Sequence, residues 1–171
     1  MSQIEGGIGL FENAGVPGAG TSEVQTLTIG GTPDGGTFKL AFDGQTTAAI
    51  TWSSTNNTLR DNVDAALEAL TNIGTGGVTV AVGTMTNGIG TLTITFGGNL
   101  AKLAVNTITV ADNSLTGTSP TLAVEETTPG VTADFRGAKK GALVSDTTNG
   151  KLYINTGTAL APTWTVVGSQ S

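Results

Sequence analysis

The amino-acid sequence predicts a mainly β protein: an antiparallel β-sandwich with one α-helix, a small β-hairpin region at the C-terminal end and an extended N-terminal arm. Three observations predict this fold. The 171 residues include 26 glycines and 32 threonines, which favour short strands and tight turns because threonine is β-branched and glycine permits positive φ. Apolar and polar side chains alternate along about seven short segments in the middle of the chain. One further segment repeats its apolar side chains with the spacing of a helix.

The first segment, residues 1–21, is the predicted N-terminal arm. It is rich in glycine and alanine, has few large apolar side chains and shows the period of neither a strand nor a helix. Such a segment buries too little surface to offset the entropy that it loses on ordering. We expect it to order against another surface, and the alternative is a terminus that frays in the free chain.

Residues 22–130 form the predicted β-sandwich domain. Its first two strands are expected at residues 24–29 and 37–42, where apolar side chains alternate with polar ones. Residues 30–36 are expected to be a hairpin loop between them, because they combine proline, aspartate and glycine. The later strands of the domain are expected at residues 46–52, 77–82, 90–96, 107–110 and 121–124.

The helix of this domain is predicted at about residues 57–71. Its apolar stripe, at helical spacing, consists of Leu59, Val63, Ala66, Leu67 and Leu70. The opposite side, which we expect to be solvated, carries Arg60, Asp61, Asp64 and Glu68. Thr58 followed by Asp61 resembles a capping box, which would begin the helix there.

Residues 131–171 form the predicted C-terminal β-hairpin region. The step Asn149-Gly150 supplies the positive φ values of a tight turn between strands at residues 142–144 and 151–154. A last strand is expected at residues 163–167. Three strands of this size bury too little apolar surface to be stable alone, so this region needs a partner surface.

The residue types that most enzyme chemistry uses are missing. The chain contains no histidine and no cysteine, which excludes imidazole bases, thiol nucleophiles and His or Cys metal sites. The dinucleotide fingerprint, the phosphate loop and the nucleophile elbow are each incomplete. The carboxylate pairs Asp61/Asp64 and Glu125/Glu126 are interpreted as solvated. We therefore expect no enzyme activity, no catalytic residue, no cofactor and no bound metal.

The net charge and the apolar runs exclude two classes of partner. A net charge of −6 has the wrong sign for binding nucleic-acid phosphates. No apolar run approaches the ~20 residues of a membrane helix, and the first residues lack the basic and apolar regions of a signal peptide. We expect no nucleic-acid partner, no membrane association and synthesis in the cytoplasm.

Two stretches resemble parts of known proteins. Residues 141–158 (GALVSDTTNGKLYINTGT) followed by residues 161–168 (APTWTVVG) resemble a recurrent hairpin unit of tailed-bacteriophage virion proteins, especially head decoration or capsid-stabilising (cement) proteins and fibres. In that family, a sequence similar to residues 10–21 (LFENAGVPGAGT) often precedes the hairpin unit. Residues 35–50 with residues 63–70 are similar to a β-sandwich module of phage structural proteins. The resemblance implies a surface-binding role and no reactive site.

The resemblance and the charge distribution together suggest which residues make contacts. The net charge is −2 over residues 1–21, −6 over residues 22–130 and +2 over residues 131–171, so the C-terminal region is the better candidate for contact with an acidic surface. The basic cluster of this region consists of Arg136, Lys139 and Lys140, and the alternative interpretation is that it lies on a solvated loop. For Trp164, a position in the core and a contact at an interface are equally favoured. The candidate capsid or subunit contacts are Leu10, Phe11, Arg136, Lys139, Lys140, Tyr153 and Trp164.

We therefore expect a non-enzymatic virion structural protein that binds the exterior of a phage capsid and stabilises it. Residues 1–21 and 131–171 would form one capsid-binding unit, from which residues 22–130 project as an insertion. The expected partners are the major capsid protein and further copies of the chain, with a trimer favoured, and the expected location is the capsid surface of the virion. The alternatives are a phage fibre or tail component and a bacterial surface-adhesion module.

Overall fold

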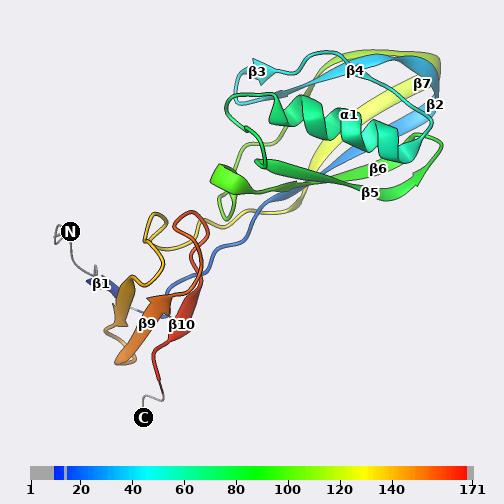
Figure 1. Cartoon of the computed structure of the whole chain (residues 1–171). Helices are drawn as coiled ribbons and strands as arrows, with labels where there is room; N and C mark the ends of the chain where they lie inside the picture. Colours follow the sequence, from blue (N-terminus) through cyan, green and yellow to red (C-terminus); the bar gives the residue numbers. More distant parts are fainter. Residues whose placement is uncertain (1–9, 14, 169–171) are drawn as a thin grey trace.

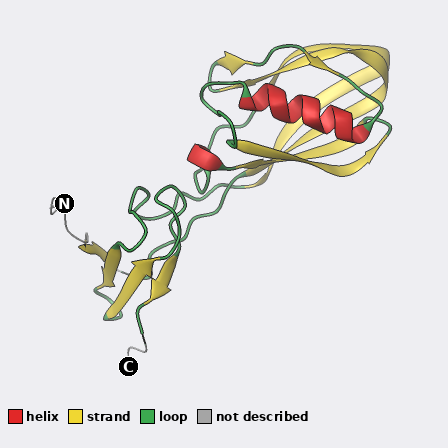
Figure 2. Ribbon diagram, in the orientation of Figure 1, coloured by secondary structure: helices red, strands yellow, loops and turns green. Residues whose placement is uncertain are grey.

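The computed structural model describes residues 10–13 and 15–168 and places them in two lobes (Figure 1). The predicted fold class is confirmed. The described part is mainly β with one α-helix, and its strands pair antiparallel except for one parallel pair in the smaller lobe (Figure 2). We call residues 22–130 the large lobe, and residues 10–13, 15–21 and 131–168 the small lobe.

The large lobe is a β-sandwich-like sheet with a helix. In chain order its elements are β2 (Val24–Phe42), β3 (Gln45–Thr46), β4 (Ile50–Thr51), α1 (Asn56–Glu68), β5 (Val78–Thr86), β6 (Ile89–Phe96), the 3-10 helix η1 (Gly98–Leu100) and β7 (Thr109–Thr128). The strand order is β3-β2-β6-β5, and β4 and β7 also pair with β2. The small lobe has a four-stranded sheet that consists of β1 (Leu10–Asn13), β8 (Leu143–Asp146), β9 (Lys151–Asn155) and β10 (Trp164–Val166).

Residues 30–36 are not the hairpin loop that the sequence predicts. They lie inside the 19-residue strand β2, which pairs along almost its whole length with the 20-residue strand β7. The register shifts between Gly30 and Thr32 and between Pro33 and Gly35. Glycine and proline suit a bulge that bends a long strand as well as they suit a hairpin turn, so the local pattern could not separate the two.

Other strand boundaries also differ from the prediction. β7 joins the two predicted strands 107–110 and 121–124, because β2 offers one continuous partner. The predicted strand 46–52 is instead divided into β3 and β4. Thr47 causes this break, because its Oγ1 accepts the N–H of Leu40 at 3.1 Å and its own N–H donates to the carbonyl of Leu40 at 2.9 Å.

The bend in β2 creates the core. A straight strand of this length would span about 60 Å, yet the ring of Phe42, at its end, lies 5.3 Å from the ring of Phe96, which follows the β6 partner of Val24. The two halves of β2 therefore fold over one another and enclose their apolar side chains. The largest fully buried side chains are Phe38, Phe42, Phe96, Leu27, Ile29, Leu40, Ile50, Leu59, Leu67, Leu92, Ile94 and Ile108.

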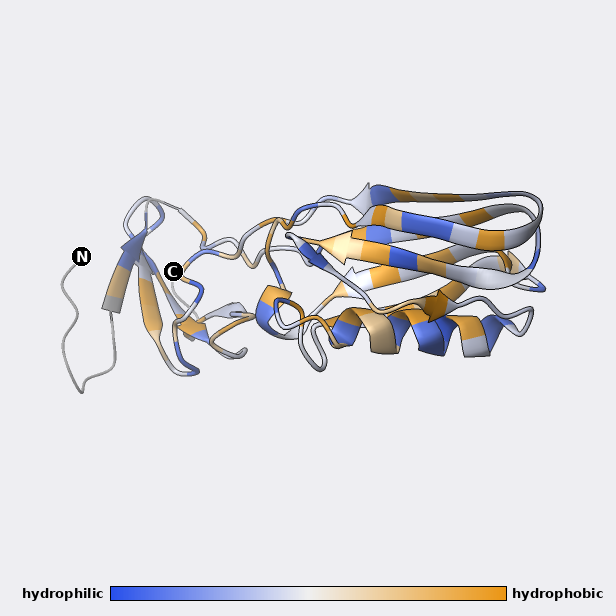
Figure 3. Cartoon of the chain, turned by 90° about the horizontal axis from the view of Figure 1, so that it is seen from above, coloured by the Kyte–Doolittle hydropathy of each residue, from blue (hydrophilic) through white to orange (hydrophobic). Residues whose placement is uncertain are grey.

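Helix α1 closes the open side between the two halves of the bent sheet. It packs against β4 on one half and β5 on the other (Figure 1), and along the elements of this lobe hydrophobic residues alternate with hydrophilic ones (Figure 3). The predicted stripe is confirmed by the complete burial of Leu59, Val63 and Leu67. The helix ends at Glu68, three residues earlier than predicted.

The predicted capping box is wrong. The N-cap is Thr55, whose side chain makes no capping hydrogen bond. Asn56 instead ties the start of the helix to the β5–β6 turn, because its Nδ2 donates to the carbonyl of Met85 at 3.0 Å and its Oδ1 accepts the N–H of Gly88 at 2.8 Å. The helix therefore begins where tertiary contacts place it.

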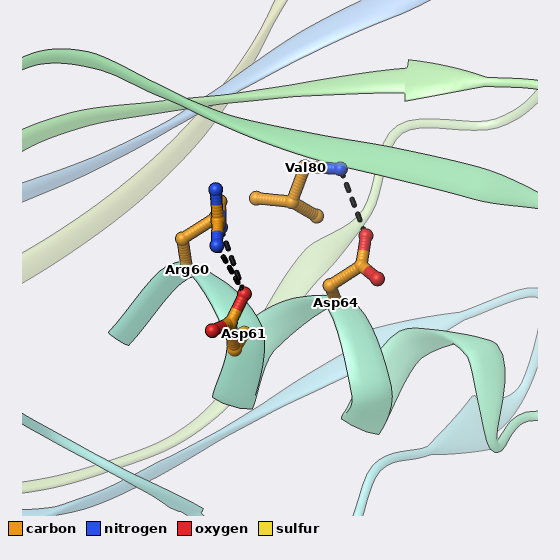
Figure 4. A network of polar contacts seen from close by, with 4 residues as sticks. All are labelled: Arg60, Asp61, Asp64 and Val80. Atoms are coloured by element: carbon orange, nitrogen blue, oxygen red, sulfur yellow. Dashed lines mark hydrogen bonds and ion pairs between the residues drawn. The ribbon is translucent and has the colours of Figure 1, made fainter. Parts of the chain in front are cut away.

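Two carboxylates on the polar side of α1 are not simply solvated. Asp64 Oδ1 accepts the N–H of Val80 at 2.8 Å (Figure 4). Glu68 Oε1 accepts the N–H of Gly76 at 2.7 Å. β5 is an edge of the sheet, so Asp64 satisfies a backbone donor that would otherwise be unpaired at that edge. The exposed ion pair of Arg60 with Asp61 contributes little.

A buried polar cluster anchors the segment that leads into β7. Gln25 lies on the core face of β2, where its Nε2 donates to Glu23 Oε1 at 2.5 Å. Glu23 Oε2 accepts the N–H of Val105 at 2.9 Å, and Gln25 Oε1 accepts the N–H of Ile108 at 2.8 Å. These bonds satisfy backbone donors inside the lobe, which makes the burial of a glutamate and a glutamine tolerable.

The two lobes are joined by a neck of two antiparallel segments. Thr21 and Val131 exchange both backbone hydrogen bonds, at 2.8 and 2.9 Å. Asp134 adds two more bonds to Gly18, one from its backbone N–H and one to its carboxylate. Gly20, at φ +68°, is required here, because a Cβ would lie 2.6 Å from the backbone nitrogen of Ala133. The chain therefore enters and leaves the large lobe at one place. That the large lobe is an insertion remains a prediction.

We predict that Leu67→Ala lowers the free energy of unfolding by about 2–5 kcal/mol, because the change removes a fully buried side chain and leaves a cavity. Asp61→Ala, on the exposed side of the same helix, is the control and should stay within about 0.5 kcal/mol of the native chain. Urea unfolding measures both values. Equal effects would contradict the assigned faces of α1.

Candidate docking surface of the small lobe

The small lobe joins the two ends of the described chain in one sheet. Its strand order is β1-β8-β9-β10, with β1 parallel to β8 and the other pairs antiparallel. Residues 10–13 of the predicted arm are therefore an edge strand of the C-terminal sheet, and Leu10 pairs with Leu143. Residues 1–9 lie outside the described part of the chain.

Asn155 is the polar centre of this lobe. Its side chain is buried, and its Nδ2 donates to the carbonyl of Ala138 at 2.7 Å. Its Oδ1 accepts the N–H groups of Gly157 and Thr163, both at 2.9 Å. One amide thus fixes the loop between β9 and β10 at both ends. The position of β10 depends on this side chain, which the sequence analysis did not single out.

Asp146 organises the turn between β8 and β9. Its Oδ2 accepts the side-chain N–H of Asn149 at 2.7 Å, and its Oδ1 accepts the backbone N–H groups of Thr148 and Asn149, both at 3.0 Å. The side-chain bond from Asn149 is the main reason that the pKa of Asp146 lies below its ordinary value of 3.8. The backbone donors and Lys151 lower the pKa further, and burial opposes them.

Three aromatic rings form a row on the small lobe. The ring of Phe135 lies 5.2 Å from the ring of Phe11 and 6.0 Å from the ring of Trp164, to which it is nearly perpendicular. The Nε1 of Trp164 donates to the carbonyl of Asp134 at 3.4 Å. All three rings are half-buried, whereas Tyr153 is buried inside the lobe. Phe135 was missed in the sequence analysis, although it lies beside the basic cluster in sequence.

The structure separates the three residues of that basic cluster. The guanidinium of Arg136 donates to the carbonyls of Asn99 and Ala101 in the large lobe, so this side chain fastens the neck. Lys139 and Lys140 are exposed. Only these two lysines of the cluster therefore remain available for an acidic partner.

The exposed large apolar side chains gather on one lobe. Among the described residues there are four, with exposed fractions of 62% for Val16, 55% for Val131, 38% for Leu160 and 39% for Val166. All four belong to the small lobe, which has the smaller core. The segments that contain these four residues are too short to show a hydrophobic period, so the sequence could not predict that the side chains are exposed.

Acidic residues form no metal-binding group in the described part of the chain, where no three Asp or Glu side chains gather. Asp112 and Ser114 bond one another at 2.9 Å, and Asn113 accepts the N–H of Leu115. These residues lie inside the strand β7 and not in a turn. None of the helices that the structure describes is long and apolar enough to cross a membrane.

Comparisons with known proteins found few matches. No protein-family model matches the chain, and neither does any curated protein. Among solved structures, the chain is similar to a protein of Mycobacterium phage Patience, with 16% sequence identity and a TM-score of 0.43. The match covers 88% of this chain and 57% of that one, so the chain spans little more than half of its phage neighbour. A likeness of this size carries no conclusion about function.

We predict that the turn at Asp146 loses stability when the pH falls below 3.8, the ordinary pKa of the group. The pKa is lowered in the folded state, so the carboxylate stabilises the fold above that pH, and protonation removes the contribution as the pH falls through the folded-state pKa. Amide exchange of Thr148 and Asn149 between pH 5 and 2 measures this effect.

Asp146→Asn is the matched variant, and Asp112→Asn in the large lobe is the control. We expect Asp146→Asn to speed the exchange of the two amides at pH 5 and to differ less from the native chain at pH 2. A difference that is the same at both pH values would show that the charge of Asp146 does not hold the turn.

Proposed function

We propose that the chain is a non-enzymatic virion structural protein that binds the exterior of a phage capsid through its small lobe and stabilises the shell. The observation that carries the proposal is the gathering of the exposed large apolar side chains on the small lobe. The large lobe encloses its own core, whereas the small lobe leaves apolar surface for a partner to cover.

Charge supports the same orientation. Residues 131–171 have a net charge of +2, residues 1–21 one of −2 and residues 22–130 one of −6, so an acidic shell would repel the large lobe and favour contact through the small one. The lobes lie end to end (Figures 1 and 3). A small lobe seated on a surface would therefore leave the large lobe projecting from it.

Stabilisation of the shell would follow from mass action. A protein that binds the assembled shell and not the free subunits shifts the equilibrium toward assembly. The partner in this proposal is the major capsid protein. The resemblance of residues 141–158 to decoration and fibre proteins supports a virion role. A fibre or tail component is the second candidate, and electron microscopy of labelled virions distinguishes the two by position.

We predict that Val16→Ser combined with Leu160→Ser weakens binding to undecorated capsids at least tenfold, because both exposed apolar side chains would be covered there. The control is Ala48→Glu with Ala49→Glu, two exposed residues of the large lobe. Co-sedimentation measures occupancy. Native occupancy by the serine variant would reject the small lobe as the docking surface.

A second prediction tests the contribution of charge. Lys139→Ala with Lys140→Ala should weaken capsid binding about 2- to 30-fold at low salt, and the difference from the native chain should shrink as salt rises. The paired glutamates at residues 48 and 49 change the net charge by the same amount on the other lobe. If both variants weaken binding equally, the overall charge and not the two lysines controls docking.

A further inference from the structure

The open edges of the two sheets are protected to different degrees. An edge strand presents unpaired backbone N–H and carbonyl groups, and proteins usually guard such edges with charges, proline, bulges or short length. In the large lobe, β3 and β4 are two residues long, and Asp64 occupies the N–H of Val80 on β5. The long edge of β7 carries Asp112, Gly117, Pro120, Glu125 and Glu126.

β10 is three residues long, and it has no charged residue, proline or bulge to protect its edge. Residues 163–167, Thr-Trp-Thr-Val-Val, contain no charge, no proline and no glycine, and all five are β-branched or aromatic. Val166 is 39% exposed. At the other edge of the same sheet, β1 carries the exposed Glu12. A strand of this composition at an open edge is the kind that pairs with another chain.

The backbone bonds show which groups of β10 face outward. Thr156 donates its N–H to the carbonyl of Thr163 at 2.8 Å, and Val167 donates to the carbonyl of Leu152 at 2.9 Å. Because the bonding direction alternates along an antiparallel strand, the N–H and carbonyl groups of Trp164 and Val166 point away from β9.

We propose that β10 pairs with β10 of a second copy of this chain, antiparallel and across a twofold axis at Thr165. This register places Trp164 opposite Val166 of the other copy, and the outward groups of these two residues then bond to one another. The outward backbone groups of residues 164–166 therefore match those of the same residues in a second, antiparallel copy. The pairing covers the exposed Val166 with an aromatic ring, a favourable cross-strand pair, and brings no charges of like sign together.

A second copy is favoured over another occupant because this self-complementarity lies in the chain itself. A contact of this symmetry makes a dimer, in contrast to the trimer that the sequence favours. The paired edge is short, so the dimer buries less than the ~1,200 Å² of a standard interface and should exchange with monomer. The inference concerns the free protein and does not depend on capsid binding.

The test is a charge swap at the twofold axis. Thr165 is exposed, so Thr165→Lys and Thr165→Glu leave the interior unchanged, but each places two like charges directly opposite one another in the pair. Sedimentation equilibrium over a wide concentration range should show a monomer–dimer equilibrium for the native chain. Each variant alone should associate at least tenfold more weakly, and an equimolar mixture of the two should regain the native association.

Two further measurements complete the test. Thr118→Lys on β7 adds the same charge at the far bend of the large lobe and should associate like the native chain. Amide exchange of Trp164 and Val166 should slow as the concentration of native protein rises. A native chain that is monomeric or trimeric throughout, variants that associate normally, or a mixture that fails to recover would each overturn the proposal.

Discussion

The pairing of β2 with β7 is the interaction on which the rest of the structure depends. Two strands of about twenty residues make a ribbon whose apolar side chains would remain uncovered if it were straight. The bulges near Gly30 and Pro33 let the ribbon fold over, so that Phe42 reaches Phe96. The core, the place for α1 and the closure of the sandwich all follow from this bend. Because the two strands are antiparallel, the chain also enters and leaves the lobe at one point, where Thr21 meets Val131.

This geometry makes the small lobe possible. β1 and β8 lie on opposite sides of the large lobe in sequence, and the neck brings them together as parallel neighbours. Four short strands supply little apolar burial, and the buried amide of Asn155 and the carboxylate of Asp146 compensate by fixing the loops. The same shortage of core leaves Val16 and Leu160 on the surface. The division into a self-contained lobe and a lobe that needs a partner therefore has one physical origin, which is the unequal size of the two cores.

Polar side chains have different tasks in the two lobes. In the large lobe the carboxylates of Glu23, Asp64 and Glu68 accept backbone N–H groups, so acidic residues secure the interior and one edge of the sheet. In the small lobe Arg136 reaches across the neck to carbonyls of the large lobe. The contacts between the lobes thus include a side chain that the sequence alone had assigned to a basic contact cluster. A charge in a sequence shows that a group is ionised, but its partner depends on which chain segment the fold brings near.

The sequence by itself determined the fold class, the helix stripe of Leu59, Val63 and Leu67, and the position of the turn between β8 and β9, because periodicity and turn chemistry act over a few residues. Within that turn only Gly150, and not Asn149, has the predicted positive φ. Only the tertiary structure decided that residues 30–36 bend a strand instead of closing a hairpin, since both uses need the same residue types and the choice lies with β7, some eighty residues away along the chain. It also decided which candidate contacts reach the surface. Lys139 and Lys140 do, whereas Tyr153 is buried and Arg136 is bound at the neck. Burial is a property of neighbours that are distant in sequence, and no local pattern specifies them.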